Sequence, residues 1–287
     1  MSQRSFAPSA QPRPARPDLV QDALERADVA LRTGGLEDAA RISGSILAAD
    51  GADARAARIL GQALLRLGRA EAALNPLQQA ARHTEDPAVE TLLALALIDA
   101  GRPKDAWAPL RAATARRPAY PPAFLELGAR LGEAGRFDEA AEVFEAGLAA
   151  APDAVVLRVG LGHLCLARND RAQARRQFQA AQAAQPARRD AAAGLASVLA
   201  LDGDHAEAAR LYRQALQARP DDAVLQIGLA KSLLELGRRD EGEALLRAAA
   251  GAGPQLAAMA TAALAATPRG RMFLRPSAAA AYLCAAA

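Results

Sequence analysis

The residues of this sequence best suited to chemistry are its histidines and cysteines, and their spacing argues against a metal centre. His163 and Cys165 are two residues apart. On a helix, two such side chains point to nearly opposite sides, so they cannot bind one metal ion without distortion. His83 and His205 lie far away in the sequence. The sequence therefore predicts no metal site and no cofactor.

Other motifs that carry chemistry are absent from the sequence or have a structural explanation. Gly160-x-Gly162 lacks the strand-turn-helix context of a phosphate-binding loop and fits close helix packing. No Gly-x-Ser-x-Gly, His-Glu-x-x-His or Gly-Lys-Ser/Thr element occurs. The acid pairs Asp138-Glu139 and Asp221-Asp222 stand where helices are expected to begin, and acids stabilise that end of a helix. We therefore expect a protein that is not an enzyme.

The elements that carry these residues repeat with a period of 34 residues. Proline recurs at this spacing, at Pro118, Pro152, Pro186, Pro220 and Pro254. Residues that tolerate the left-handed conformation recur at spacings of 33 or 34, at Gly34, Gly68, Gly101, Gly135, Asn169, Gly203 and Gly237. Such residues end helices. The sequence therefore predicts pairs of helices with a glycine-type turn inside each pair and a proline after it.

Each period contains the apolar spacing of two amphipathic helices. In residues 121–154 the first helix carries Phe124, Leu127 and Leu131, and the second carries Ala140 and Phe144. A small residue recurs at the position of Ala140 and predicts close contact with a neighbouring helix, at Ala39, Ala73, Ala106, Ala140, Ala174, Ala208 and Gly242.

The pattern Phe124-x2-Leu127-Gly128-x2-Leu131, Ala140-x3-Phe144 and Pro152 resembles the tetratricopeptide repeat. Seven repeats fit, at 20–53, 54–86, 87–120, 121–154, 155–188, 189–222 and 223–256. The first departs most, because Arg26 and Ser43 stand where bulk is expected, and it is interpreted as a solvent-facing cap. The resemblance implies an all-α protein, a right-handed superhelical α-solenoid of antiparallel helix pairs whose first helices line a concave groove. The composition, rich in Arg, Ala, Gly and Pro, favours a bacterial source.

The sequence divides into a repeat array and two tails. Residues 1–18 are predicted to form a disordered basic tail, residues 19–266 the array with a final capping helix, and residues 267–287 a tail with a short helix over Ser277–Leu283. Met272, Phe273 and Leu274 in that tail are expected to dock on the last repeat or on a partner. No secretory signal or membrane-spanning stretch is recognised, which favours a cytoplasmic protein.

The charge distribution disfavours nucleic acid as a partner. The net charge is +3, but all 32 acidic residues lie in residues 18–243, which carry a net charge of −4. A slight excess of acids and only 3% aromatic residues do not suit a phosphate backbone or base stacking. A single-stranded RNA-binding solenoid is therefore the least favoured alternative.

The inner face of the first helices is the predicted peptide-binding groove, because it is too apolar for plain exposure to solvent. The candidate residues are Arg55, Arg58, Gln62, Arg66, Leu95, Ile98, Leu125, Ala129, Val159, His163, Ser197, Ile227 and Lys231. The predicted partner is a protein segment, extended or helical, that is mostly apolar with acidic residues at one end, facing Arg55, Arg58 and Arg66. Relatives that bind the carboxylate of chaperone tails use lysine, arginine and asparagine in this groove. Leu125, Ala129, Val159 and His163 do not match that pattern.

These observations predict a non-catalytic scaffold or adaptor that binds a segment of another protein in its groove. A second hypothesis is an accessory subunit that presents substrates to a separately encoded modifying enzyme, such as a glycosyltransferase.

Overall fold

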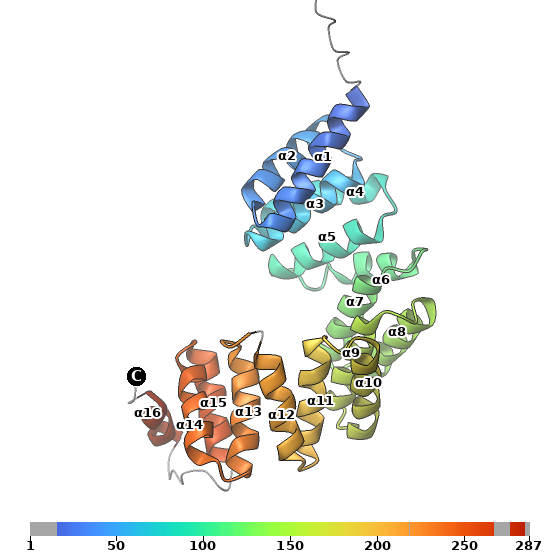
Figure 1. The fold of residues 1–287 in the computed structure, drawn as a ribbon. Coiled ribbons are helices and arrows are strands. Elements are labelled where there is room, and N and C mark those ends of the chain that lie inside the picture. Colours follow the sequence, from blue (N-terminus) through green and yellow to red (C-terminus); the bar gives the residue numbers. More distant parts are fainter. Residues whose placement is uncertain (1–15, 218, 267–275, 285–287) are drawn as a thin grey trace, which may run out of the picture. The chain divides into compact units, whose positions relative to one another are not determined.

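The computed structural model describes residues 16–217, 219–266 and 276–284, which form sixteen helices and no strand (Figure 1). The protein is an all-α helical repeat. It divides into two compact units, an N-terminal unit of residues 1–127 and a C-terminal unit of residues 128–287. The division falls within helix α7 (Pro121–Glu133).

The N-terminal unit contains six helices before α7 in the described residues. They are α1 (Arg16–Thr33), α2 (Leu36–Ala49), α3 (Ala54–Arg66), α4 (Ala70–His83), α5 (Pro87–Asp99) and α6 (Trp107–Ala115). Consecutive helices pack together, and α3 also contacts both α1 and α5. The odd-numbered helices therefore form one layer and the even-numbered helices pack outside it.

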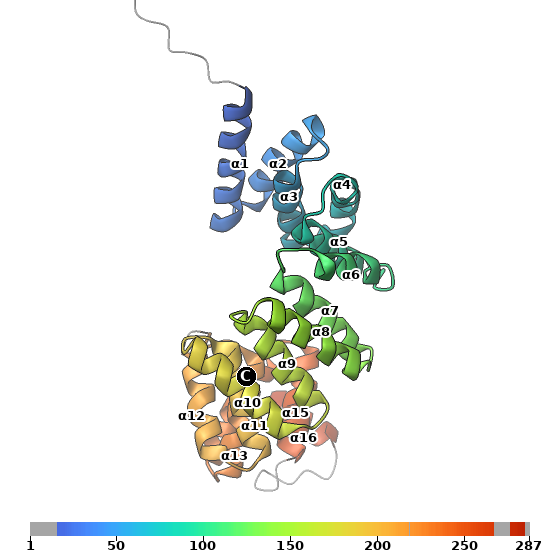
Figure 2. The same cartoon turned by 90° about the vertical axis from the view of Figure 1, so that its right-hand side faces the viewer.

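The C-terminal unit repeats this arrangement after α7. Its helices are α8 (Phe137–Ala150), α9 (Val155–Ala167), α10 (Arg171–Ala184), α11 (Arg189–Leu201), α12 (His205–Leu216), α13 (Ala223–Glu235), α14 (Arg239–Ala250), α15 (Pro254–Ala266) and α16 (Pro276–Cys284). Helices α9, α11, α13 and α15 contact one another in order, and each is followed by its partner helix (Figure 2).

The turn inside each helix pair adopts the predicted left-handed conformation. Asn169 has φ of 59°, and the glycines at the equivalent positions have φ between 70° and 89°. In each turn the next residue donates its backbone N–H to a carbonyl five residues earlier, as Asp170 does to Cys165 at 2.8 Å. The prediction that Asn169 replaces glycine in the turn is confirmed.

The core is built from small residues and a few large rings. The recurring small residues from Ala39 to Ala208 are 0–1% exposed, as close helix packing requires. Phe144 lies against Gly128, and Phe178 lies against both Gly162 and Gly194. Ser43 is also fully buried and donates its hydroxyl to the Ala39 carbonyl at 2.5 Å. Ser43 therefore lies in the core although the repeat pattern expects a larger residue there, because the hydrogen bond satisfies its small polar side chain.

Helix α16 packs against α14 and α15 and covers the buried carboxylate of Glu243. The Tyr282 hydroxyl donates to Oε2 of Glu243, and the Arg247 guanidinium lies 4.8 Å from the centre of the Tyr282 ring. Leu283 joins the apolar core formed by α13, α14 and α15. One polar cluster and a small apolar contact therefore fix α16.

Several expectations concern residues outside the described ranges. They include the first fifteen residues of the expected basic tail and the segment Met272–Leu274. Among the described helices, none combines the length and apolar character needed to cross a bilayer.

Candidate protein-binding surface

The predicted arginine cluster of the N-terminal unit is partly occupied by the chain itself. Arg55 donates to Oε1 of Gln21 at 3.2 Å, and Arg66 donates to the Leu31 carbonyl at 2.7 Å. Both bonds connect α3 to α1. Arg58 and Gln62 are partly exposed on the same helix. Two of the three arginines that were expected to meet an acidic partner therefore have a structural role in this unit.

The remaining predicted groove residues differ in exposure. Leu95, Ile98, Leu125 and Ala129 are partly exposed. Val159 and Ile227 are 5% and 6% exposed, so they offer little free surface to a ligand. His163, Ser197 and Lys231 reach the surface of the C-terminal unit.

His163 and Ser197 both line a pocket of about 710 Å³, which we call the α11 pocket. It is bounded by α9, α11, α12, α13 and the loops that precede α11 and α13. Its lining consists of His163, Ala187, Arg188, Arg189, Asp190, Ala193, Gly194, Ser197, Tyr212, Arg219, Asp222, Val224 and Leu225. Lys231 and the other predicted groove residues do not line it.

The pocket exists because the inward-facing residues of α11 are small. Ala193, Gly194 and Ser197 leave space where larger side chains would fill the groove. Gly194 cannot be larger, because a Cβ atom there would lie 2.2 Å from the ring of Phe178. Phe178 is fully buried and also contacts Gly162, so the ring has no room to move away.

The floor of the pocket carries three polar groups with defined partners. The hydroxyls of Ser197 and Tyr212 are 2.9 Å apart, and Ser197 also donates to the Ala193 carbonyl. Burial raises the pKa of Tyr212, so its hydroxyl stays protonated at neutral pH. The His163 ring packs edge-on against Phe178 with centroids 5.0 Å apart. This packing lowers the pKa of His163 by desolvation, although Asp190 opposes the shift, so the imidazole is neutral at pH 7.

The rim of the pocket is charged. Arg188 and Asp190 form a two-pronged ion pair with both N–O distances at 2.8 Å. Asp222 accepts the backbone N–H of Leu225 at 3.2 Å and so caps α13, as expected for an acid at a helix start. Within the described part of the chain, Arg189 and Arg219 have no side-chain hydrogen bond or ion pair. The rim therefore presents two guanidinium groups to solvent.

The three rim arginines were not among the predicted site residues. The prediction considered only the inner faces of the helices, whereas Arg188, Arg189 and Arg219 lie at or beside the loops between repeats. The segment QPARRD at residues 185–190 was the available signal, because it places two arginines at the start of a helix.

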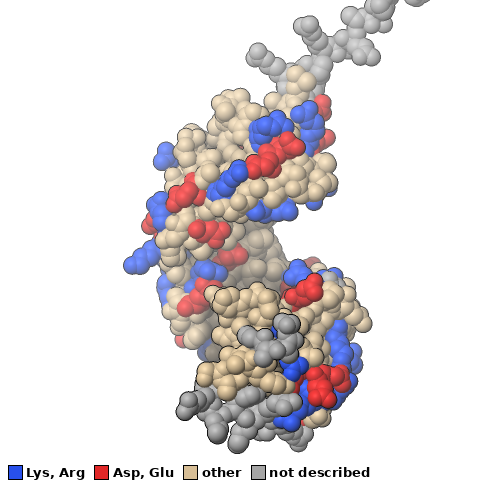
Figure 3. All heavy atoms as spheres, turned by 90° about the vertical axis from the view of Figure 1, so that its left-hand side faces the viewer, with Lys and Arg blue, Asp and Glu red and all other residues tan. Residues whose placement is uncertain are grey.

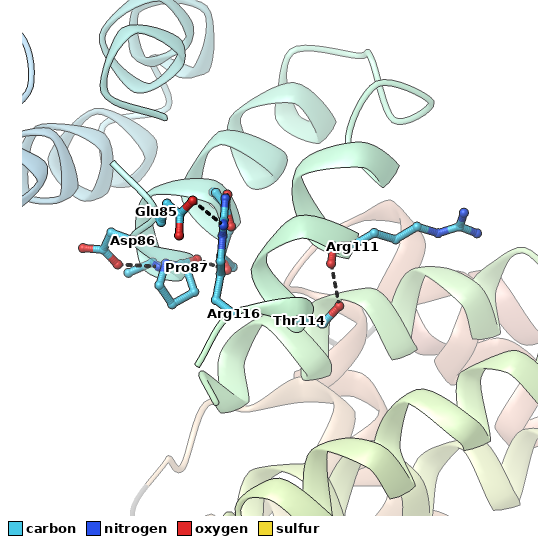
Figure 4. A network of polar contacts seen from close by, with 9 residues as sticks. Glu85, Asp86, Pro87, Arg111, Thr114 and Arg116 are labelled. Atoms are coloured by element: carbon cyan, nitrogen blue, oxygen red, sulfur yellow. Dashed lines mark hydrogen bonds and ion pairs between the residues drawn. The ribbon is translucent and has the colours of Figure 1, made fainter. Parts of the chain in front are cut away.

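A second polar cluster lies in the N-terminal unit, between the start of α5 and the end of α6 (Figure 4). Arg116 binds Glu90 at 2.9 Å and Glu85 at 3.0 Å, and the hydrogen bond to Glu90 raises the pKa of Arg116. Asp86 accepts the N–H of Ala88 and caps α5. Glu90 is 5% exposed, and its Oε2 atom has no hydrogen-bond partner in the described structure. The guanidinium of Arg116 holds the Glu90 carboxylate in place, so the cluster connects α5 to the end of α6. We interpret it as a structural ion-pair cluster and not as a catalytic site.

Charged residues and possible metal ligands also lie outside these two clusters, within the described residues. On the face in Figure 3, basic and acidic side chains are interspersed. Arg69 and Glu37, for example, form an ion pair at 2.7 Å. Over the ranges that the structure describes, no three His, Cys, Asp or Glu residues cluster closely enough to bind a metal ion.

Comparison with known proteins relates most of the helical array to one family. Two family models, both described as tetratricopeptide repeat, match residues 24–89 and 91–155 and residues 132–198 and 199–266. No curated protein matches the sequence.

Solved structures share the fold at low sequence identity. PilF of Pseudomonas aeruginosa is 21% identical, with 67% of this chain and 87% of that chain covered and a TM-score of 0.58. A tetratricopeptide repeat protein of Parabacteroides merdae is 17% identical, with 85% and 99% covered and a TM-score of 0.63. One from Thermus thermophilus is 24% identical, with 62% and 97% covered and a TM-score of 0.53. The chain belongs to the tetratricopeptide repeat family.

Proposed function

We propose that this chain is a non-catalytic scaffold that binds a peptide segment of another protein at the α11 pocket. Tetratricopeptide repeat proteins generally mediate protein–protein interactions. The observation that carries the proposal here is the pocket itself, with small residues on its floor, apolar walls and charged groups at its rim. Binding sites in proteins are typically concave and mostly apolar with a few placed polar groups.

The chemistry of the pocket supports binding over catalysis. The Ser197 hydroxyl has hydrogen bonds to Tyr212 and to a backbone carbonyl, and no base lies next to it among its hydrogen-bond partners. The carboxylates of Asp190 and Asp222 are engaged by Arg188 and by a helix cap. An activated nucleophile needs a base within hydrogen-bond reach, and these contacts supply none.

Selection of peptides from a phage-displayed random library tests the proposal on the full chain. The variant Ala193→Trp fills the pocket floor with a large ring, and Ala183→Trp places the same ring on the exposed surface of α10. We expect the wild type and Ala183→Trp to enrich the same peptides, and Ala193→Trp to lose them. Thermal unfolding followed by circular dichroism checks that both variants fold. Enrichment of the same peptides by a folded Ala193→Trp variant would show that the binding surface lies elsewhere.

A further inference from the structure

The α11 pocket has an uneven charge balance that its own residues do not neutralise. Arg188 is paired with Asp190, and Asp222 is committed to the cap of α13. This leaves Arg189 and Arg219 on the rim without an acidic partner in the described structure. Both side chains are exposed, so their hydrogen-bond donors are available to a ligand.

The two arginines come from successive repeats, and both line the pocket. Arg189 is the first residue of α11, and Arg219 stands three residues before the cap of α13. Beyond them, Val224 and Leu225 give the pocket an apolar wall, and Val224 is 57% exposed. A ligand that pairs with the two arginines and also covers the apolar wall needs a negative group next to an apolar one.

We infer that the α11 pocket is a specificity subsite for an acidic side chain, Asp or Glu, that is flanked by apolar residues within a continuous segment of the partner. The carboxylate would accept hydrogen bonds from Arg189 and Arg219, which match its geometry well. The flanking apolar residues would cover Val224 and Leu225. This inference rests on the proposed function, and it moves the acidic contact from Arg55, Arg58 and Arg66 to the C-terminal unit.

An anionic nucleic acid fits the pocket less well. Asp190 and Asp222 stand on the same rim and would repel neighbouring phosphates along a strand. The phenol ring of Tyr212 in the lining is 6% exposed and packs against Gly228, so it offers no face for base stacking. A single carboxylate avoids both difficulties.

The same random-peptide library, selected on full-length variants, tests the inference. The double variant Arg189→Glu with Arg219→Glu reverses the charge of the rim. Its control is Arg82→Glu with Arg213→Glu, which makes the same change of net charge at two exposed arginines outside the pocket. We expect peptides from the wild type and from the control to contain an acid next to apolar residues, and peptides from the rim variant to lack it.

A synthetic copy of the most enriched peptide then gives the size of the effect by fluorescence anisotropy. Changing its acid to the matching amide should weaken binding to the wild type about tenfold, and less so at high salt. The same change should leave binding to the rim variant unaltered or improved.

The outcomes separate the inference from the function on which it rests. If the peptides lack an acid, or keep it on the rim variant, while Ala193→Trp still abolishes selection, the pocket binds peptides but the acidic subsite is wrong. If Ala193→Trp leaves selection unchanged, or no peptide is enriched, the proposed function fails and the inference with it. If labelled oligoadenylate displaces the peptide and needs both arginines, the subsite binds phosphate and the inference is overturned.

Discussion

Phe178 is the residue on which the shape of the α11 pocket depends most directly. Its ring is fully buried between Gly162 of α9 and Gly194 of α11. Each glycine is required by a close approach, because a Cβ atom would lie within 2.8 Å of the ring on either side. The Phe178 ring, which comes from α10 in the other layer of helices, therefore fixes the position of the pocket floor.

Replacing Gly194 by alanine should destabilise the protein by about 1–3 kcal/mol, because the added methyl group overpacks a ring that cannot move. Gly44→Ala is the matched control. A Cβ atom at Gly44 has its nearest neighbour at 4.0 Å, so this change should instead stabilise α2 by roughly 0.5–1 kcal/mol. Urea unfolding of both variants measures whether each substitution lowers or raises the free energy of unfolding. A stabilised Gly194→Ala variant would contradict the packing described for Phe178.

Single residues also show where sequence reasoning succeeded and where it failed. Asn169 was predicted in the left-handed turn because its place in the period and its backbone preference agree. Arg189 and Arg219 were not predicted as site residues. The two residues are 30 apart in sequence and line one pocket in the fold, and helical periodicity carries no information about that.

At the scale of elements, the loops between repeats differ in what they contribute. The loops before α11 and α13 supply the rim of the pocket, whereas the loop after α6 supplies Arg116 to the cluster with Glu90. The helices keep a common length and packing in nearly every repeat, although α6 is short, at 9 residues. Variation between repeats is therefore concentrated where it does not disturb helix packing.

Helix α16 depends on a single hydroxyl for much of its polar contact. Tyr282→Phe removes one hydrogen-bond donor to Glu243, whose side chain is 2% exposed, and leaves its ion pairs with Arg239 and Arg247 on α14. Loss of a hydrogen bond to a buried charged group should weaken the docking of α16 by about 1–3 kcal/mol. Limited proteolysis should then cleave before α16 sooner than in the wild type.

Ser277→Ala provides the control, because Ser277 is exposed on the same helix. It should leave the cleavage rate unchanged. Equal cleavage rates for Tyr282→Phe and the wild type would mean that the apolar contact of Leu283 alone holds α16.

At the scale of the whole molecule, the 34-residue period predicted the fold class and the family. The reason is physical, because each repeat buries its apolar face only against its neighbours, so the same pattern must recur along the chain. The same period does not predict how exposed each groove residue is. Helical periodicity assigns each residue to a face of its helix, but it does not predict that packing buries Val159 and Ile227.

The repeat model predicts which deletions the chain tolerates. Removing residues 204–237 deletes α12, α13 and their flanking turns, one full period, and joins α11 to α14 with a glycine turn between them. The product should stay helical by circular dichroism and unfold at lower urea. It should also lose peptide binding, because Tyr212, Arg219 and Val224 leave with the deleted segment.

A deletion of half a period in the same region, residues 204–220, is the comparison. It removes α12, one helix of a pair. The small and large core residues that follow are then shifted by half a period relative to the preceding repeats. We expect this variant to lose cooperative unfolding. Equal stability of the two deletions would refute the helix pair as the structural unit.

The separation between the floor and the rim of the α11 pocket has a consequence for how this protein can evolve. The floor is fixed by backbone and by the buried ring of Phe178, so a ligand meets a preorganised surface and its binding costs the protein little conformational entropy. Arg189 and Arg219 on the rim are exposed, so their replacement should barely affect folding. Under the proposed function, substitutions at these two arginines change partner preference while the stability of the array stays constant.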